Sequence, residues 1–288
     1  MIRKINIGAG PFWQFNEWEI LDNVPGKYHG KKNHYGKCWD SKLSSNSYDV
    51  IFCSHMLEHI PQFRLEKTIY EFNRILKING TIRILVPDLK KLASAYIKNN
   101  QKVFSGQKKY IDFMGIGSAF IRKIISPGGN TILVSREFDE IIGSYGHLFA
   151  FDFEMLRLIL SKWGFNQINK CKIGESKIPE IRKNPQSFVC NGKKYSLKDP
   201  FVKNKKYKNS NSEYFFTGFD KITDNQLIVE AKKIKNVEYK KTTIFSDYYH
   251  RGFQSPPDKI KIFLIKIICK IVDNLFLVIT KLRSLFRS

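Results

Sequence analysis

Short apolar runs alternate with stretches of helical periodicity along the first ninety residues. Leu65 to Lys77 carries apolar residues at the three- and four-residue spacing of an amphipathic helix. Further helices are expected over 89–102 and 152–163. The apolar runs expected to form strands lie at 4–7, 18–22, 49–53, 82–87, 167–173 and 227–231. Strands that alternate with helices predict an α/β protein with a mostly parallel sheet.

The first two runs end in residues that suit a ligand. The run at 4–7 leads into Gly8-Ala9-Gly10, and the next run ends in Asp22. Glycines let the backbone turn sharply and let a ligand come close. A carboxylate at the same edge can accept hydrogen bonds from both ribose hydroxyls. These residues predict an adenosine-bearing ligand at the carboxyl edge of the sheet, although a glycine turn without a ligand fits the same letters.

The spacing of these residues narrows the class of ligand. A dinucleotide fingerprint needs a third glycine three positions after Gly10 and an acid about 20 residues further on. This chain has Trp13 at the third position, and Asp22 follows Gly10 by 12 residues (22 − 10). The Gly-Lys-Ser/Thr of a phosphate-binding loop does not follow either. A ligand with ribose but without pyrophosphate fits best, and S-adenosylmethionine is such a ligand.

The histidine-rich segment after the 49–53 run allows two interpretations. His55-x-x-Glu58-His59 matches the pattern of inverted zinc peptidases, which need both histidines on one face of a helix. The preceding strand and Pro61 disfavour a helix here. We therefore predict a strand end and a turn, with no metal. Hydrogen bonds from His55 and His59 to neighbouring loops remain an alternative to a direct catalytic role.

Five motifs in order resemble the class I S-adenosylmethionine-dependent methyltransferases of the type-11-like group. They are N-I-G-x-G (6–10), W-x-x-x-D (18–22), S-H-x-L-E-H (54–59), E-x-x-R-x-L-K-x-x-G (71–80) and R-x-x-V-P-D (83–88). The resemblance covers residues 4–88 and implies a Rossmann-like, doubly wound sheet of seven strands. One departure is Lys77-Ile78-Asn79-Gly80, where the family has K-P-G-G, but Asn and Gly still permit that turn.

The resemblance also implies roles for the candidate residues. Gly8, Ala9 and Gly10 would hold the methionine part of the cofactor, and Asp22 the ribose. The pocket would be lined by Ser54, His55, Glu58 and His59. Asp40 is expected at the end of a third strand near the adenine amino group, or else in a loop. His147 is the candidate for a substrate contact or a catalytic base, with a capping or packing role as the alternative.

The chain beyond the motifs is expected to divide into three parts. The methyltransferase-like domain would cover 1–235, with a lid at about 105–145 and an insertion at about 176–224. The interleaved aromatic and lysine residues of this insertion favour a solvated loop, with a surface for single-stranded nucleic acid as the alternative. A linker at 236–258 would follow. In 259–288, polar residues recur at steps of three, four or seven and leave a wide apolar face. This predicts an amphipathic helix that lies in a membrane interface, or packs on protein, since its longest uncharged stretch is too short to span a bilayer.

Composition limits the remaining choices. The formal net charge is +23, which favours anionic membrane or nucleic acid as a partner unless it reflects a lysine-rich composition alone. The five cysteines show neither metal spacing nor a disulfide framework. With a first strand so close to Met1, we expect a cytoplasmic protein, peripheral at the membrane. The expected reaction is methyl transfer to a small-molecule or lipid-linked acceptor, such as an envelope saccharide precursor. An RNA methyltransferase and an inactive, membrane-attached interaction module are the alternatives.

Overall fold

The computed structural model describes residues 2–10, 13, 15–23, 30–104, 107–125, 146–183, 187–191, 193–195, 199–204, 214–220 and 225–240. The chain divides into two compact units, and the first consists of Met1–Ser126 and His147–Tyr239. All described residues except Gly146 and Lys240 belong to this first unit. The predicted helix at 259–288 and most of the predicted linker lie outside the described residues.

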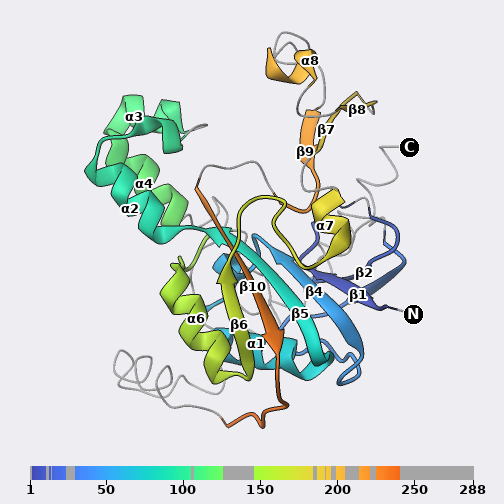
Figure 1. Ribbon diagram of the computed structural model, residues 1–288. Helices are drawn as coiled ribbons and strands as arrows, with labels where there is room; N and C mark the ends of the chain where they lie inside the picture. The colour runs from blue at the N-terminus through green and yellow to red at the C-terminus, as the bar shows by residue number, and fades with distance from the viewer. Residues whose placement is uncertain are drawn as a thin grey trace, which may run out of the picture. The chain divides into compact units, whose positions relative to one another are not determined.

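A seven-stranded sheet forms the centre of the first unit (Figure 1), with the order β3-β2-β1-β4-β5-β10-β6. Its strands are β1 (Lys4–Ile7), β2 (Glu19–Asp22), β3 (Lys32–Tyr35), β4 (Tyr48–Ser54), β5 (Leu76–Pro87), β6 (Phe165–Lys170) and β10 (Gln226–Lys233). The first five strands pair in parallel. β10 runs antiparallel to both of its neighbours. The predicted seven-stranded, mostly parallel α/β sheet is confirmed.

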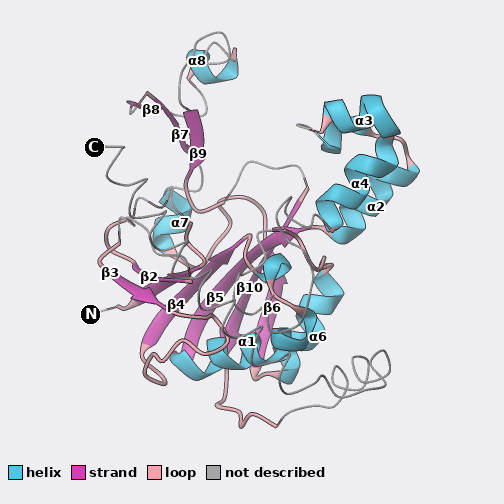
Figure 2. Cartoon of the chain, turned by 180° about the vertical axis from the view of Figure 1, so that it is seen from behind, coloured by secondary structure: helices cyan, strands magenta, loops and turns pink. Residues whose placement is uncertain are grey.

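Apolar side chains fill both faces of the sheet, as expected of parallel strands covered on both sides. On one face Ile51 and Ile84 pack beneath α1 (Gln62–Ile75) and α6 (Phe153–Lys162), the pair of helices in front of the sheet in Figure 2. On the other face Phe52 and Leu85 join a cluster with Trp13, Trp18, Ile178, Ile181 and Phe219. Consecutive residues of one strand thus pack into the layers on opposite faces of the sheet, because side chains alternate along a strand.

The ends of the main helices follow from local chemistry. Asp88 caps α2 (Leu89–Ile97) by accepting from the Lys91 N–H, and Asp152 caps α6 by accepting from the Met155 N–H. Gly164, with φ +80°, follows the end of α6, where an added Cβ would lie 2.8 Å from a backbone oxygen. This confirms the helix predicted at 152–163 and its glycine stop. The predicted turn at 77–80 appears as a bulge in β5, with Asn79 at φ +67°.

Several helices follow β5 and share a small core of their own. α2 ends at Ile97, earlier than predicted, and a 3-10 turn, η2 (Gln101–Phe104), follows it. α3 (Lys108–Met114) and α4 (Ile116–Ile124) lie in the predicted lid region. The buried residues of this group are Leu92, Ala95, Phe104 and Ala119. Among the described residues no helix is long and apolar enough to span a bilayer.

The prediction of a solvated loop at 176–224 is wrong for its described part. A short helix, α7 (Pro179–Lys183), is followed by a three-stranded antiparallel sheet of order β8-β7-β9 and a helical turn, α8 (Pro200–Lys203). The strands are β7 (Ser187–Cys190), β8 (Lys193–Tyr195) and β9 (Tyr214–Thr217). β7 and β9 are rich in aromatic and β-branched residues, which favour strands, and this local preference outweighs the polar composition around them.

Candidate active site

The glycine turn and Asp22 meet at one edge of the sheet. β1 and β2 are parallel and pair Ile7 with Leu21, so both strands end at the same place. The Gly8 N–H donates to the Leu21 carbonyl at 2.8 Å. The Gly10 N–H donates to Oδ2 of Asp22 at 3.1 Å. The structure therefore brings together the two features from which the sequence predicts a cofactor site.

The two glycines differ in what surrounds them. Both have positive φ, +74° at Gly8 and +65° at Gly10. A Cβ on Gly8 would lie 2.4 Å from Cγ of Met56, whereas a Cβ on Gly10 would have no neighbour within 4 Å among the described residues. Close packing against Met56 thus explains why a glycine is needed at position 8. The sequence had suggested a different reason, the close approach of a ligand. Ala9, between them, packs against the aromatic cluster beneath the turn.

The segment after β4 is a turn, as predicted, and not the α-helix that an inverted zinc peptidase needs. Ser54 is the last residue of β4, His55 follows with φ +51°, and Leu57–His59 form a single 3-10 turn, η1. Nδ1 of His55 lies 3.1 Å from Oε1 of Glu58. The Glu58 side chain is fully buried. His55 therefore contacts Glu58, and it does not share one face of an α-helix with His59.

Opposing effects act on the Glu58 carboxyl group. Burial is the largest of them and by itself raises the pKa. The hydrogen bond with His55 and the electrostatic attraction of the His55 and His59 side chains lower it. Together the histidines outweigh burial, so the pKa of Glu58 lies below its ordinary value. The carboxylate is thus held in its charged form inside the protein.

His147 reaches the same turn from a distant part of the chain. Its ring centroid lies 5.0 Å from that of His59, and the two rings are nearly perpendicular. Its Nδ1 lies 2.8 Å from the carbonyl oxygen of Lys123. The next residue, Leu148, donates its N–H to the carbonyl of Glu58 at 2.7 Å. The structure thus unites three predicted site residues: Glu58, His59 and His147.

Asp40 lies apart from the end of its strand. β3 ends at Tyr35, five residues before Asp40 (40 − 35), so the expected position at the end of a third strand is wrong. Asp40 instead sits in a turn and pairs with Lys42 at 2.9 Å. The hydrogen bond from Lys42 is the main cause that lowers the pKa of Asp40. The turn forms because Lys37 and Asp40 bridge across it. Its contact with adenine stays a prediction.

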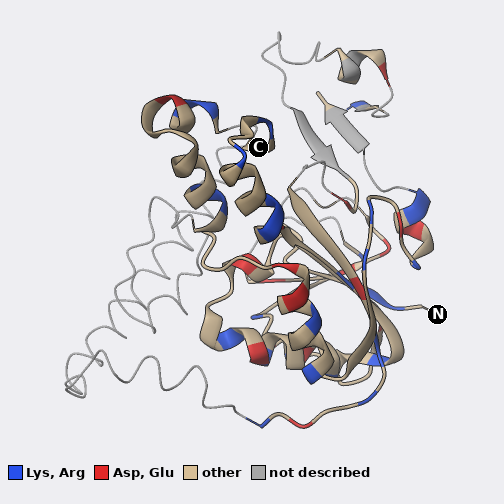
Figure 3. Cartoon of the chain, turned by 60° about the vertical axis from the view of Figure 1, so that its left-hand side comes forward, with Lys and Arg blue, Asp and Glu red and all other residues tan. Residues whose placement is uncertain are grey.

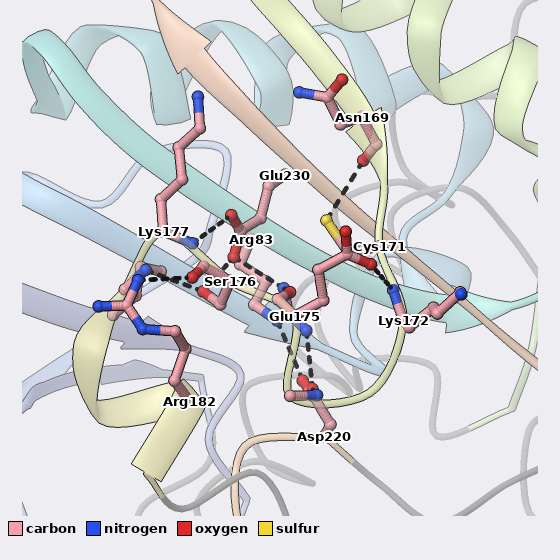
Figure 4. A network of polar contacts seen from close by, with 12 residues as sticks. Arg83, Asn169, Cys171, Lys172, Glu175, Ser176, Lys177, Arg182, Asp220 and Glu230 are labelled. Atoms are coloured by element: carbon pink, nitrogen blue, oxygen red, sulfur yellow. Dashed lines mark hydrogen bonds and ion pairs between the residues drawn. The ribbon is translucent and has the colours of Figure 1, made fainter.

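Sequence reasoning missed a buried network around Arg83 (Figure 4). The Arg83 side chain is fully buried and donates two hydrogen bonds to Asp220, at 3.0 and 2.7 Å, and one to Glu230 at 2.7 Å. It also donates to the carbonyl oxygen of Glu175 at 2.9 Å. An arginine within the apolar run of β5 was the available signal, because such a charge needs buried acids. The network ties β5 to β10 and its flanking loops.

The comparison with known families decides the class of domain. Residues 25–84 match the family model described as "Methyltransferase domain", and the match covers β3, β4, α1 and most of β5. Residues 25–84 thus form part of a methyltransferase domain. The predicted resemblance to methyltransferases agrees with this match, and S-adenosylmethionine is the cofactor that the resemblance implies. No curated protein matches the chain.

Solved structures similar to the methyltransferase domain show low identity. A SAM dependent methyltransferase from Archaeoglobus fulgidus is 16% identical, with a TM-score of 0.38 over 81% of this chain and 86% of that one. The CurJ carbon methyltransferase is 13% identical, with a TM-score of 0.38 over 81% of this chain and 49% of that one. A phosphoethanolamine N-methyltransferase from Haemonchus contortus is 14% identical, with a TM-score of 0.36, 81% coverage of this chain and 49% of that one. The chain thus spans about half the length of the last two.

Proposed function

We propose that the methyltransferase domain methylates a lipid-linked or envelope saccharide precursor at an anionic membrane surface. The observation that carries this proposal is the exposure of four large apolar side chains on α3, on α4 and at the residue that follows α4, here called the apolar patch. Its four residues are Phe113, Met114, Ile121 and Ile125, which are 81%, 62%, 55% and 50% exposed. A surface that exposes several large apolar side chains is typical of one that binds a membrane or a partner.

Basic residues on the same helices suit headgroups of negative charge. Lys108, Lys109 and Arg122 are exposed, and Figure 3 marks the Lys and Arg positions of these helices in blue on the backbone. Lys108 pairs with Asp112 at 2.9 Å, and Arg122 lies 3.9 Å from the ring centroid of Tyr110. Apolar side chains flanked by cations are the pattern of a helix at an anionic interface. The amphipathic pattern of the sequence at 259–288 independently favours attachment to a membrane.

The proposed reaction is an in-line displacement at the methyl carbon. A lone pair of the acceptor forms the new bond to carbon while the carbon–sulfur bond breaks, and its electrons return to sulfur. Adenosylhomocysteine leaves as a neutral thioether, so the protein mainly has to align the reactants. Asp22 would hold the ribose, and the glycine turn the methionine part. A base is needed only where the acceptor atom carries a proton, and His147 is then the candidate.

Label transfer tests the acceptor. Purified full-length protein is incubated with membranes and methyl-labelled S-adenosylmethionine, and the label is followed into solvent-extracted lipid, soluble saccharide and RNA. Label in the lipid or saccharide fraction, lost with Asp22→Ala, supports the proposal. Label confined to RNA supports the alternative that the net charge of +23 favours, and contradicts the proposed acceptor.

Vesicle sedimentation tests the membrane surface separately. Phe113→Asp and Ile121→Asp should each weaken binding to vesicles that contain anionic lipid. Leu158→Asp is the matched control, because Leu158 is 56% exposed on α6, away from the patch. Equal losses in all three variants, or no vesicle binding by the unaltered protein, would contradict a role for the patch.

A further inference from the structure

Three side chains near the predicted cofactor site are of the types that bind metal ions and lie close together. The ligand atoms of Glu58, His59 and His147 all lie within 4.8 Å of one another. The geometry points to a divalent transition-metal site, in contrast to the sequence, which predicted no metal. Ligands of a four-coordinate zinc ion lie about 2.0–2.2 Å from it and hence roughly 3.5 Å apart. An inward shift of the side chains by about 1 Å would close the site.

The state of Glu58 is the first argument for an ion. Its side chain is fully buried, and within the described part of the chain its Oε2 has no hydrogen-bond partner. His55 contacts the other oxygen, Oε1. A buried carboxylate oxygen without a partner is costly, whereas a bound cation would satisfy it directly. The second oxygen of Glu58 is therefore available as a ligand atom in a place that water does not reach.

The orientation of His147 is the second argument. The carbonyl oxygen of Lys123 can only accept a hydrogen bond, so Nδ1 of His147, 2.8 Å away, carries the proton. In the neutral imidazole the lone pair then lies on Nε2. Metal-binding histidines typically have one ring nitrogen fixed in this way, which orients the other toward the ion. The bond from Leu148 N–H to the Glu58 carbonyl holds the two segments together.

The donor set selects the kind of ion. Two imidazoles and one carboxylate favour borderline ions such as zinc, cobalt or iron(II) over magnesium and calcium, which prefer oxygen ligands alone. Three protein ligands leave a further position for water or an acceptor oxygen. Because η1 follows β4, which pairs with β1, this position lies at the sheet edge of the glycine turn. With Nε2 on the ion, His147 would be a metal ligand and not the base. If the proposed methyl transfer is right, the ion would bind the acceptor and make its hydroxyl easier to deprotonate.

Metal binding tests the site without relying on activity. The full-length protein is produced without a histidine tag, freed of metal with a chelator, and titrated with zinc chloride by calorimetry. We expect one zinc ion per chain and weaker or no binding of magnesium. Replacement of zinc by cobalt should give the visible absorption bands of a protein-bound ion. His59→Ala and His147→Ala should each weaken zinc binding by ~10-fold or more.

His34→Ala is the matched control, since His34 lies on β3 and contacts Glu19 at 2.8 Å. It should leave zinc binding unchanged. Absence of stoichiometric zinc in the unaltered protein, or an equal loss in His34→Ala and His147→Ala, would overturn the inference. Circular dichroism establishes that each variant is folded. S-adenosylmethionine titrated into the same samples separates the two proposals, because a chain that binds cofactor but no zinc refutes the metal site alone.

Discussion

The backbone N–H of Gly10 donates to the carboxylate of Asp22 at 3.1 Å, which joins the turn after β1 to the end of β2. Hydrogen bonds to a charged group contribute about 1.5–3 kcal/mol. Asp22→Ala removes both this contact and the predicted ribose acceptor, so we expect S-adenosylmethionine affinity to fall by ~10- to 150-fold. Isothermal calorimetry measures it.

Asp49→Ala is the control for this substitution. Asp49 lies at the start of β4, at the opposite edge of the sheet, where it pairs with Lys77 at 2.8 Å. Its loss should leave cofactor affinity unchanged. An Asp22→Ala protein that binds S-adenosylmethionine as tightly as the Asp49→Ala protein would show that the carboxylate does not hold the ribose.

Gly8 and Gly10 should respond differently to alanine. Both substitutions place a Cβ at positive φ, which costs ~1–2 kcal/mol. Gly8→Ala additionally drives its Cβ against Met56, so it should destabilise the fold more than Gly10→Ala does in urea unfolding. Met56→Ala should recover part of the Gly8→Ala loss, because it removes Cγ, the colliding atom at 2.4 Å, and leaves only Cβ at 2.8 Å. A double-mutant cycle with no coupling between Gly8 and Met56 would contradict this packing.

The parts of the fold that follow a local rule could be predicted from the sequence. Apolar runs, the glycine turn and Asp22 reflect spacing within a few residues, and the structure has these strands where the pattern indicates them. The same is true of α6, for which Asp152 and Gly164 supply the cap and the stop. Asp40 was misplaced because strand β3 is polar and short, so periodicity does not mark where it ends.

Contacts between distant segments could not be predicted in this way. The sequence gives no signal for the contact of Met56 with Gly8, or for that of the Lys123 carbonyl with His147. Each contact depends on how two elements pack. His147 was a candidate only through the family resemblance. Its position beside His59 became visible with the fold, since the backbone bond from Leu148 to Glu58 sets it.

Glu71 should make stability depend on acid pH. Its carboxylate accepts from Arg74, at 2.7 Å, and from the Ser41 N–H at 2.9 Å. Burial raises the pKa of Glu71, but the bonds from Arg74 and Ser41 outweigh it, so the pKa lies below its ordinary 4.5. As pH falls below about 5, the unfolded chain takes up the proton first, and the free energy of unfolding decreases.

Glu71→Gln removes this contribution, so the variant should be less stable at neutral pH and should lose less stability on acidification. Urea unfolding between pH 6 and pH 3 measures how the free energy of unfolding of each protein changes with pH. Each extrapolated free energy carries ~10% uncertainty. Glu154→Gln is the control, because Glu154 pairs with Arg157 on the exposed face of α6. Parallel curves for Glu71→Gln and the unaltered protein would contradict the assignment.

Among the described charged residues, removal of Arg83 should cause the largest loss of folding stability. Arg83→Met leaves Asp220 and Glu230 buried with their main cation gone, and breaking one side of a buried ion pair costs ~3–5 kcal/mol. Changing all three residues together, to Met, Asn and Gln, should cost less, because no unpaired charge then remains. Arg157→Met on the solvent-facing side of α6 serves as the control and should leave the urea midpoint unchanged. Equal midpoints for Arg83→Met and Arg157→Met would mean that the network does not hold β5 to β10.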